Sequence, residues 1–398
     1  MSIIAKKVQD CIENASWIRR MFEEGTALRQ EHGDDKVFDF TLGNPTMEPP
    51  PELKRELKRL AESPVPGMHR YMNNAGYEET RAAVAEVIAA TCNQQVNAGH
   101  VVMSCGAGAA MNICLKTILN PGNEVIILIP FFVEYKFYID NQGGVPVTVP
   151  TLEDFQPDLS AIEKAITEKT RAIIINSPNN PTGVIYPKQT LMQLGKLLKD
   201  KERQFGQPIT VISDEPYARI SFEETVTNIF DCVQNSVIVT SHSKDLALPG
   251  ERIGYLAANP AMPGVDLFMQ GAIFCNRVLG FVNAPALMQR LVTSLQRCSV
   301  DIEQYRKKRD RLYDHLTSLG FKMVKPGGGF YLFPKSPLGD EMEFIRIAQK
   351  YLILLVPGSG FGAPGYFRIA YCVDDDMIER SLKAWTKLAK EIGLQINK

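Results

Sequence analysis

The feature that most constrains the fold is a series of short apolar runs that alternate with helical stretches between residues 75 and 260. The runs are rich in Ile and Val, residues that favour strands. Continuous runs of this kind are typical of strands buried on both faces of a mostly parallel sheet covered by helices. The runs are Val101–Ser104, Glu124–Ile129, Ala172–Asn176, Thr210–Asp214 and Ser236–Thr240. We therefore predict an α/β fold class with a large domain built around this sheet.

The C-terminal part of the chain has a different pattern. From Pro285 to Leu319 it is rich in Leu, Arg, Lys and Gln at helical spacing, which predicts one or two long helices that leave the sheet domain. Residues 329–333 and 366–370 are strand-like, and residues 377–390 have the pattern of an amphipathic helix. These elements predict a second, smaller α+β domain.

Chain length also favours more than one domain. The chain has 398 residues, whereas one domain usually has about 100–200, so we expect two domains that share a cleft. A helical segment at residues 18–32 and the residues after it are expected to pack with the C-terminal part. The predicted divisions are an N-terminal segment at 1–47 that packs with the small domain, a large domain at 48–290 and a small domain at 291–398.

Charge and composition exclude several classes of partner. The formal net charge is −1 and no Lys/Arg block is present, so we expect neither nucleic acid nor an anionic membrane as a partner. The N-terminal residues lack the apolar core of a signal peptide, and the longest apolar runs, such as Val125–Ile129, are too short to span a bilayer. We therefore expect a cytoplasmic protein with small-molecule partners.

The eight cysteines and five histidines are dispersed along the chain. No C-x-x-C pair occurs, and no Cys/His cluster has the spacing of a zinc site. We expect reduced thiols and no metal site.

The most specific segment runs from Ser241 to Tyr255, directly after a strand-like run. It places two hydroxyls (Ser241 and Ser243), a lysine (Lys244) and an arginine (Arg252) at the C-terminal end of a strand, where α/β folds bind ligands. Pyridoxal 5′-phosphate (PLP) needs this set, because it uses an amine for a Schiff base and hydroxyl and guanidinium donors for its phosphate. A single lysine is more simply explained as part of a solvated turn, but the whole segment favours a cofactor site.

Two upstream segments carry further polar groups that such a cofactor uses. Asp214 ends an apolar run, and a carboxylate there can pair with the protonated pyridine nitrogen and keep the ring an electron sink. Tyr217 can donate to the ring hydroxylate, and Asn180, within the turn Ser177–Gly183, can offer its amide to the same oxygen. Taken alone, Asp214 is equally well explained as a helix cap or a metal ligand, and the turn as a plain connection.

The loop after the run Val101–Ser104 contains Gly106, Ala107 and Gly108 and precedes a helical stretch. Its backbone N–H groups and the helix N-terminus can hold a phosphate. A G-x-G fragment also occurs in dinucleotide-binding proteins, but the third glycine is absent and no acidic residue ends the next run. The loop therefore favours a phosphate site without identifying the ligand.

In this order and spacing, the four segments resemble those of the class I and II aminotransferases, which are PLP-dependent enzymes of fold type I. The likeness covers nearly the whole chain. It implies a large PLP-binding domain with a mostly parallel seven-stranded sheet covered by helices, a smaller α+β domain, and a homodimer with shared active sites. It also implies transfer of an amino group between an L-amino acid and a 2-oxo acid, with Lys244 as Schiff-base residue and proton carrier and with Asp214 and Tyr217 as the other catalytic residues.

Further positions acquire roles by the same resemblance. Tyr71 matches a tyrosine that reaches the phosphate in the partner subunit, and Phe132 matches an aromatic residue that stacks on the pyridine ring. Arg368 matches the arginine that binds the substrate α-carboxylate, and Gly43 lies in a substrate-side loop. Taken singly, Phe132 is equally well a core aromatic residue and Arg368 a surface ion-pair residue. The predicted cofactor-binding residues are Tyr71, Gly106, Ala107, Gly108, Phe132, Asn180, Asp214, Tyr217, Ser241, Ser243, Lys244 and Arg252, and the predicted substrate-binding residues are Gly43, Asn180, Arg277 and Arg368.

Three positions bear on specificity. His242 departs from the family pattern, in which a small or apolar residue is usual, and we interpret it as a packing residue rather than a catalytic one. Some aspartate-specific members have a lysine where this chain has Gly108, which offers no side chain to a distal carboxylate. Others use an arginine before an Asn/Pro turn, a place close to Arg277. Arg277 is therefore predicted to reach a neighbouring active site and admit 2-oxoglutarate or a dicarboxylic amino acid, with apolar donors also accepted; a surface ion pair is the alternative.

Other functions remain open at this point. A PLP-dependent lyase or decarboxylase would use the same cofactor site. A non-catalytic PLP sensor domain of a transcription regulator lacks support, because no helix-turn-helix precedes the domain and Lys244, Asp214 and Arg368 are all present. A dinucleotide-binding oxidoreductase would leave the lysine segment unexplained. We therefore favour a PLP-dependent aminotransferase.

Overall fold

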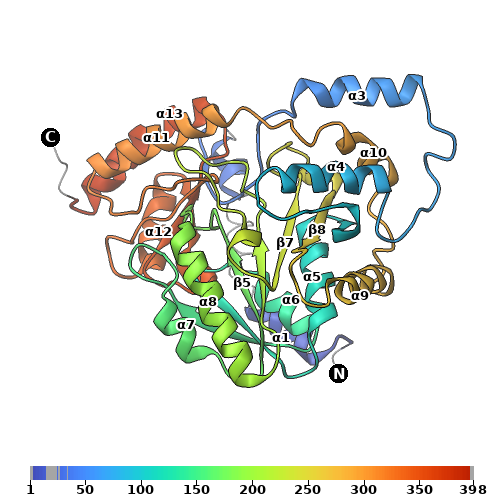
Figure 1. The fold of residues 1–398 in the computed structure, drawn as a ribbon. Helices are drawn as coiled ribbons and strands as arrows, with labels where there is room; N and C mark the ends of the chain where they lie inside the picture. Colours follow the sequence, from blue (N-terminus) through green and yellow to red (C-terminus); the bar gives the residue numbers. More distant parts are fainter. Residues whose placement is uncertain (1–2, 15–24, 26, 34, 395–398) are drawn as a thin grey trace. The chain divides into compact units, whose positions relative to one another are not determined.

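The computed structural model describes residues 3–14, 25, 27–33 and 35–394 (Figure 1). The predicted helical segment at 18–32 lies largely outside these residues; its described part, residues 25 and 27–32, is helical. The contacts within the chain divide it into two compact units. The sheet unit comprises residues 47–306 and 325–329, and the small unit comprises residues 1–46, 307–324 and 330–398.

The sheet unit contains a seven-stranded sheet with the order β2-β8-β7-β6-β5-β3-β4 (Figure 1). Strands β3 to β7 are parallel, and β8 is antiparallel to both of its neighbours, β7 and β2. The strands are β2 Val101–Ser104, β3 Glu124–Ile129, β4 Val145–Pro150, β5 Thr170–Asn176, β6 Thr210–Asp214, β7 Ser236–Ser241 and β8 Gly254–Ala258. The predicted α/β fold with a mostly parallel sheet is confirmed, and each predicted run forms one of its strands.

Two strands, β4 and β8, were not among the predicted runs. β4 is an edge strand with mostly exposed or half-buried residues, and it contains Pro146 and Pro150. An edge strand tolerates proline because one of its sides has no hydrogen-bonding neighbour. β8 begins at the end of the lysine segment and includes Gly254, Ala257 and Ala258, residues with little strand propensity. Both strands form because neighbouring strands pair with them, not because of a strong local pattern.

Both faces of the sheet are buried. Ile127 and Ile174 belong to one apolar cluster with residues of α5, α6 and α9. Their sequence neighbours Ile126 and Ile173 point to the opposite face and are also fully buried. The helices of this unit are α3 Pro51–Glu62, α4 Glu78–Ala89, α5 Ala107–Ile118, α6 Tyr135–Asn141, α7 Leu159–Ala165, α8 Lys188–Phe205, α9 Val265–Val278 and α10 Ala286–Thr293. Burial on both faces explains why the strands read as continuous apolar runs.

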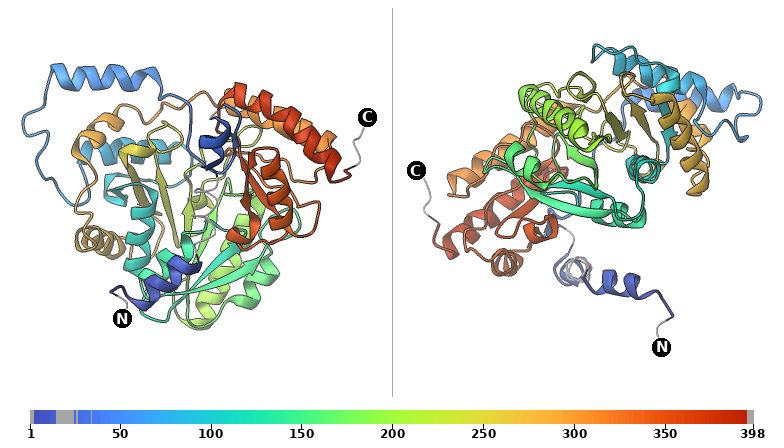
Figure 2. Two further views of the ribbon diagram at one scale, coloured as in Figure 1. Left: turned by 180° about the vertical axis from the view of Figure 1, so that it is seen from behind. Right: turned by 60° about the horizontal axis from the view of Figure 1, so that its bottom comes forward.

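The small unit has an aromatic core. Phe321 packs edge-on against Phe344, Phe367 and Trp385, with ring centroids 5.9, 6.2 and 5.7 Å away. The unit contains a three-stranded antiparallel sheet, β11-β12-β9, and a two-stranded parallel sheet, β1-β10. Helices α11 and α13 run side by side (Figures 1 and 2). The elements are α1 Lys6–Asn14, β1 Phe38–Asp39, α11 Ile302–Ser318, β9 Tyr331–Leu332, α12 Glu341–Lys350, β10 Ile353–Leu354, β11 Val356–Pro357, β12 Phe367–Ala370 and α13 Asp375–Glu391.

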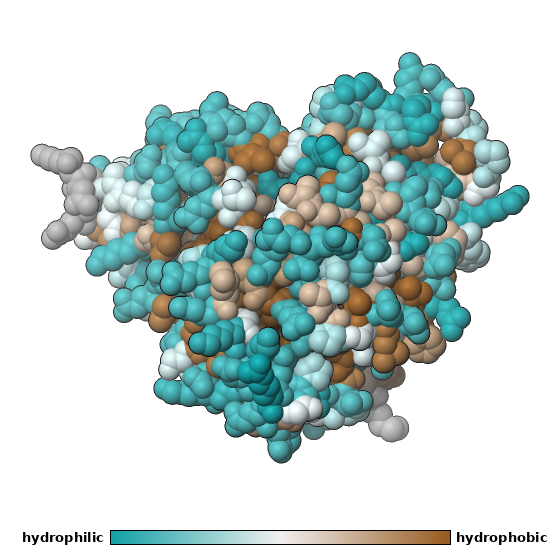
Figure 3. Space-filling view, in the orientation of Figure 1, coloured by the Kyte–Doolittle hydropathy of each residue, from teal (hydrophilic) through white to brown (hydrophobic). Residues whose placement is uncertain are grey.

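The face drawn in Figure 3 is mostly hydrophilic, with hydrophobic residues in small separate patches. Among the described residues, no helix is both long and apolar enough to cross a membrane. In the same part of the chain, no group of three or more His, Cys, Asp or Glu side chains is placed to hold a metal ion. The seven cysteines from Cys92 to Cys372 are all free.

Candidate active site

The predicted functional segments of the sheet unit meet at one edge of the sheet. Asp214, the last residue of β6, pairs with Asn176 of β5 on one side and with β7 on the other. The segments that carry Asn180, Tyr217 and Lys244 follow the ends of these three strands. Because the carboxyl ends of parallel strands lie at the same edge, the sheet brings the three segments together.

Asp214 is buried at the centre of this edge. The hydroxyl of Tyr135 donates a hydrogen bond to Asp214 Oδ2 at 2.6 Å, whereas Oδ1 has no hydrogen-bond partner among the described residues. Burial raises the pKa of Asp214 to about 7, and the Tyr135 hydrogen bond opposes this rise. A buried carboxylate oxygen without a donor is costly. This atom is therefore suited to accept a hydrogen bond from a cationic ring nitrogen, which would also favour the ionised carboxylate.

Tyr135 and Asn176 are neighbours of Asp214 that the sequence analysis missed. Asn176 Nδ2 donates to the backbone oxygen of Asp214 at 2.7 Å, and Asn176 Oδ1 accepts from the backbone N–H of Asn180 at 2.6 Å. Asn176 thus fixes the position of Asn180 relative to Asp214. Two signals could have identified them: a polar residue that ends an apolar run, and a tyrosine three residues after Phe132.

The residues predicted to contact the cofactor ring lie at this same edge. Asn180 and Tyr217 are both buried, and Tyr217 packs beside Gly329, whose φ of 70° is in the left-handed region. Phe132 is half-buried and lies edge-on to Tyr135, with ring centroids 5.6 Å apart. The sheet unit therefore carries an aromatic side chain beside Tyr135 and two buried residues, Asn180 and Tyr217, on the segments that follow β5 and β6.

The loop between β2 and α5 forms a candidate phosphate site. Gly106 directly precedes α5 and has a φ of 82°, a conformation that favours glycine. A Cβ on Gly106 would lie 2.8 Å from Arg252 Nη2, so the guanidinium lies directly against the loop. The first backbone N–H groups of α5, which begins at Ala107, have no acceptor within the helix. These N–H groups and the guanidinium together make a site suited to an anion.

The ends of β7 and β8 complete this part of the site. The Ser241 hydroxyl donates to the Ser243 hydroxyl at 2.9 Å, and both residues are buried. Gly254 pairs with Ser241, and a Cβ on Gly254 would collide with the Thr240 carbonyl and lie 3.0 Å from Gly106 Cα. Only glycine at this position allows the phosphate loop and β7 to approach so closely.

Gly108, in the first turn of α5, faces a tyrosine that the sequence analysis did not identify. A Cβ on Gly108 would lie 3.0 Å from Tyr138 Oη. Burial is the main cause that raises the pKa of Tyr138 to about 12; Glu134 and Asp214 add to the rise and Arg252 opposes it. Tyr138 therefore offers this loop a neutral hydroxyl and no charge.

Lys244 lies three residues after the end of β7, in a turn of the chain. The lysine is half-buried, while Ser243 and Asp245 on either side of it are buried. The Lys244 carbonyl accepts a hydrogen bond from the backbone N–H of Ala247 at 3.4 Å. The turn thus holds the lysine backbone at the same sheet edge as Asp214.

Tyr71 and Arg277, by contrast, lie on the surface of the sheet unit. Tyr71 is 90% exposed. Arg277, on α9, is exposed and lies over the ring of Phe274 at 5.5 Å from its centroid. Neither side chain forms a hydrogen bond or an ion pair within the described part of the chain.

The predicted carboxylate-binding residue, Arg368, belongs to the small unit. It lies on β12 and is 9% exposed. Its Nη2 donates to the Thr41 carbonyl at 2.7 Å, and its guanidinium lies 4.5 and 4.9 Å from the ring centroids of Tyr331 and Phe361. A Cβ on Gly43 would collide with the Tyr331 hydroxyl. These contacts place the buried guanidinium against two aromatic rings, where water competes little for its N–H groups.

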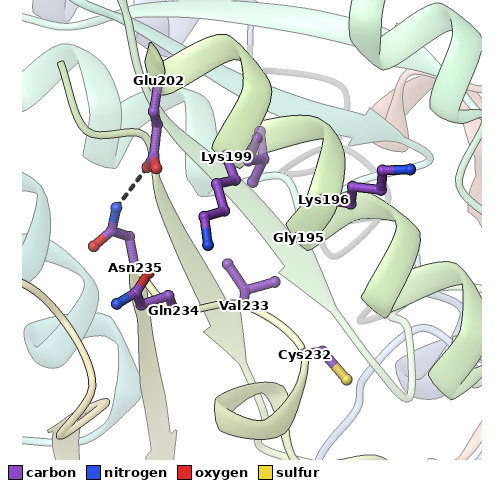
Figure 4. A pocket seen from close by; sticks show the side chains of 9 residues that line it. Gly195, Lys196, Lys199, Glu202, Cys232, Val233, Gln234 and Asn235 are labelled. Carbon is purple, nitrogen blue, oxygen red and sulfur yellow. Dashed lines mark hydrogen bonds between the residues drawn. The ribbon is translucent and has the colours of Figure 1, made fainter. Parts of the chain in front are cut away.

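The sheet unit also has a surface pocket of about 280 Å³ that none of these residues lines. It lies between α8 and residues 232–235, at the amino end of β7 (Figure 4). Its buried polar groups satisfy one another, since Asn235 Nδ2 donates to Glu202 Oε1 at 2.5 Å and the Ile209 N–H donates to the same oxygen at 2.9 Å. Nothing in this pocket therefore calls for a ligand.

The carboxyl edge of the sheet fits PLP. The unpartnered oxygen of Asp214 suits a pyridine nitrogen, and the Gly106 loop with Arg252 suits a phosphate. Lys244 lies at the same edge, three residues after β7.

Comparison with known proteins identifies the family. The model of the family described as aminotransferase class I and II matches residues 35–384. The aspartate/prephenate aminotransferase of Thermus thermophilus is 32% identical over 375 residues, which are 91% of this chain and 92% of the relative. An amino transferase structure from Eubacterium rectale has 36% identity and a TM-score of 0.95 and covers 100% of both chains.

The aspartate aminotransferase from Thermus thermophilus with maleate has 26% identity and a TM-score of 0.84, and the match covers 98% of this chain and 100% of that one. None of these matches favours a lyase or a decarboxylase. The chain belongs to the aminotransferase class I and II family and is a PLP-dependent transferase that moves an amino group between an amino acid and a 2-oxo acid.

Proposed function

We propose that this aminotransferase is a homodimer that accepts dicarboxylic amino acids and 2-oxo acids, with Lys244, Asp214 and Tyr217 as its catalytic residues. The observation that carries the proposal is the buried oxygen of Asp214 that lacks a donor. Bound PLP supplies an electron-poor ring that withdraws electron density from the substrate α-carbon. Asp214 keeps a proton on the ring nitrogen, because its ionised carboxylate and the cationic nitrogen stabilise each other.

Lys244 has two tasks in this proposal. Its amine would hold the cofactor covalently, and as a free amine Nζ would act as the base that removes the proton from the substrate α-carbon. Tyr217 and Asn180 donate hydrogen bonds to the ring oxygen, and Phe132 covers one face of the ring. The burial of Asn180 and Tyr217 supports this assignment, since few water molecules can compete for that oxygen.

The phosphate is assigned to the loop and strand ends around Arg252. The backbone N–H groups of Gly106, Ala107 and Gly108 would bind its oxygens, as would the hydroxyls of Ser241 and Ser243. The contact between Arg252 and the Gly106 backbone supports this assignment, because it places a permanent positive charge at the start of α5.

Arg368 is assigned to the substrate α-carboxylate. A planar guanidinium can form two parallel hydrogen bonds with a carboxylate. Its buried position close to the rings of Tyr331 and Phe361 supports this role, since packing against the rings restricts the side chain. Gly43 is assigned to the substrate-side loop, where a larger residue would displace Tyr331.

The proposed dimer rests on Tyr71. This side chain is 90% exposed, yet the residues that follow it are anchored: Asn74 Nδ2 donates to the Val282 carbonyl at 2.9 Å, and Asn276 Nδ2 donates to the Asn74 carbonyl at 2.8 Å. An exposed tyrosine next to an anchored loop suits a contact with the phosphate bound by a second subunit.

Mixing two inactive variants tests this dimer. A Tyr71→Ala chain retains Lys244, and a Lys244→Ala chain retains Tyr71, so a mixed dimer has one complete site. We expect activity to return after subunit exchange and to rise with the fraction of mixed dimer. If the mixed dimers form but stay inactive, Tyr71 does not act across the interface.

The proposed substrate class rests on Arg277 and on the names of the relatives, which include aspartate/prephenate aminotransferase and aspartate aminotransferase. Arg277 is exposed and has no acidic partner in the described part of the chain, so its guanidinium is available to a ligand bound to another subunit. Arg277→Ala should lower kcat/KM for dicarboxylic substrates, and the loss should correspond to about 1.5–3 kcal/mol of transition-state stabilisation. The values for alanine and leucine should change little. Arg297→Ala, which removes an exposed arginine paired with Glu86, is the control. Equal losses for both substrate classes would contradict the assignment.

We also propose a cytoplasmic location. The seven cysteines from Cys92 to Cys372 are all free, as suits a reducing compartment. Cell fractionation tests this point, and recovery in an oxidising compartment would contradict it.

The central experiment replaces the carboxylate that carries the proposal. Asp214→Asn should keep the fold but raise the free-energy barrier to proton removal from the substrate by several kcal/mol. The measurement is the single-turnover rate with one amino acid and no oxo acid. Glu215→Gln is a matched control, because Glu215 is the next residue and burial likewise raises its pKa to about 7. Unchanged turnover in Asp214→Asn would remove Asp214 from the mechanism.

A further inference from the structure

Behind the turn that carries Lys244 lies a buried polar cluster that the proposed function does not use. It consists of His242 and Asp245, which lie on either side of Lys244 in the sequence, together with Arg219 and Gln296. His242 is 3% exposed, and its Nδ1 lies 3.2 Å from Asp245 Oδ2. Arg219 Nη1 donates to the same oxygen at 3.3 Å. Side chains on both sides of Lys244 are therefore tied to each other.

The cluster also ties this turn to the segment between α10 and α11. Gln296, in that segment, has its amide nitrogen 3.2 Å from His242 Nε2, and its backbone oxygen accepts from Arg219 Nη1 at 2.9 Å. The backbone N–H of Val300 donates to the Asp245 carbonyl at 2.7 Å. The lysine turn is thus held at His242 and at Asp245 by one neighbouring segment.

The contacts of Gln296 determine which nitrogen of His242 carries the proton. Gln296 Nε2 lies 3.0 Å from the Val292 carbonyl. Because a carbonyl oxygen only accepts, this atom must be the NH₂ group of the amide. The same group meets His242 Nε2, which must then accept, so the ring proton lies on Nδ1 and is donated to Asp245. A second ring proton would place one N–H against another.

The charges agree with a neutral imidazole. Arg219 forms an ion pair with Asp245 at 3.3 Å, so Asp245 has a cationic partner without His242. Asp245 Oδ1 is buried and has no partner among the described residues. A cavity of about 50 Å³ adjoins Asp245, Arg219 and His242 and is large enough for a water molecule that would hydrogen-bond to this oxygen.

We propose that His242 is a positioning residue for Lys244. Its neutral Nδ1–H form, fixed by Gln296, orients Asp245 and keeps the turn in the conformation that presents the lysine amine at the sheet edge. His242 touches neither substrate nor cofactor in this scheme and acts through the backbone of the turn. The inference rests on the proposed role of Lys244, and it gives His242 a directed hydrogen bond where the sequence indicated packing alone.

Three substitutions separate the two hydrogen bonds of the ring. His242→Phe keeps an aromatic ring but loses both bonds. His242→Asn places an amide near the position of Nδ1 and can still donate to Asp245, whereas His242→Gln can reach Gln296 but not Asp245 in the same way. His315→Asn is the matched control, because His315 is a half-buried histidine of the small unit that contacts the Leu382 carbonyl at 3.0 Å.

We expect His242→Phe to lower kcat about 10- to 100-fold with less than about a threefold change in KM, since small misplacements of a reacting group cost about this much. The rate at which the absorption band of lysine-bound PLP appears after PLP is added to apoenzyme should fall in parallel. His242→Asn should recover most of both rates, His242→Gln should not, and His315→Asn should match the wild type. A kcat and a loading rate within twofold of wild type in His242→Phe would overturn the proposal.

Nuclear magnetic resonance of the wild type provides a readout that does not depend on activity. With ¹⁵N-labelled histidine, only five imidazoles contribute, and the signals missing in His242→Asn identify His242. A neutral ring protonated at Nδ1 supports the inference, and a ring protonated at Nε2 or at both nitrogens overturns it even if His242→Phe fails to fold. Loss of activity in Lys244→Ala tests the proposed function separately, so the two can fail independently.

Discussion

The two ends of β7 (Ser236–Ser241) differ in whether the buried polar groups nearby have hydrogen-bond partners. At the amino end, the buried polar groups of the pocket of about 280 Å³ already have partners. Asn235 Nδ2 and the Ile209 backbone N–H both donate to Glu202 Oε1. At the carboxyl end, one oxygen of Asp214 is buried without a donor, and Arg252 is pressed against the backbone of Gly106. The polar groups Asn235 and Glu202 at the amino end thus satisfy each other, whereas one oxygen of Asp214 at the carboxyl end has no donor.

This difference is consistent with a ligand at the carboxyl end. A buried polar atom without a partner lowers the stability of the free protein. Such an atom is expected where a ligand supplies the missing partner.

The largest expected difference concerns two lysines. Lys244→Ala should lower the transamination rate by at least about 10⁴-fold, because it removes both the covalent attachment and the proton carrier. Lys199→Ala, which removes a lysine that lines the pocket at the amino end (Figure 4), should leave the rate within about twofold. Steady-state kinetics and borohydride trapping of PLP check both outcomes. Normal turnover in Lys244→Ala, with PLP trapped on another lysine, would refute the assignment.

The second prediction concerns the pH dependence of apoenzyme stability. The pKa of Asp214 rises from 3.8 to about 7 on folding, so the folded state binds a proton more tightly than the unfolded state does. The stability that this proton provides is present below about pH 4 and is lost as the pH rises through 7. The loss is at most about 4 kcal/mol at pH 8.

Urea unfolding of the PLP-free protein tests this prediction. Asp214→Asn should be more stable than wild type at pH 8, and the gain should disappear towards pH 4. Glu202→Gln, at the amino end, should gain nothing at pH 8, because Glu202 already accepts two hydrogen bonds. A Glu202→Gln gain as large as that of Asp214→Asn would remove the distinction between the two ends.

A smaller effect is expected from Tyr135. Tyr135→Phe removes the 2.6 Å hydrogen bond to Asp214 and leaves both carboxylate oxygens without a protein side-chain donor. We expect the activation barrier obtained from the single-turnover rate to rise by about 1.5–3 kcal/mol, the usual value of a hydrogen bond to a charged group. Tyr186→Phe removes another fully buried tyrosine hydroxyl of the sheet unit and should leave this rate nearly unchanged. Similar losses in the two variants would show that general packing, not the bond to Asp214, is responsible.

The smallest effect on activity is expected at the amino end itself. Asn235→Ala removes the hydrogen bond to Glu202 and should lower the free energy of unfolding by about 1–3 kcal/mol. Its kcat/KM should stay within about twofold of wild type, because the pocket takes no part in the reaction. A selective rise in KM for one substrate would instead make this pocket a binding site.

The five predicted strands and the predicted helix at 377–390 appear in the structure because strong local patterns agree with their final environment. The lysine segment identified the family because residues adjacent in sequence carry most of its chemistry. The sequence also places a carboxylate at the end of β6. By itself it thus determined the fold class, the family and the principal candidate residues.

Other features depend on contacts between segments that are distant in sequence. The partner of Asp214 is Tyr135, the neighbour of Gly108 is Tyr138, and the partners of His242 include Gln296. None of these pairs has a local pattern, since each forms only when the sheet and its helices have packed. The sequence shows which side chains are available, but only the tertiary structure decides which buried atoms find partners and which remain for a ligand, because hydrogen bonding in the interior depends on distances that the fold alone fixes.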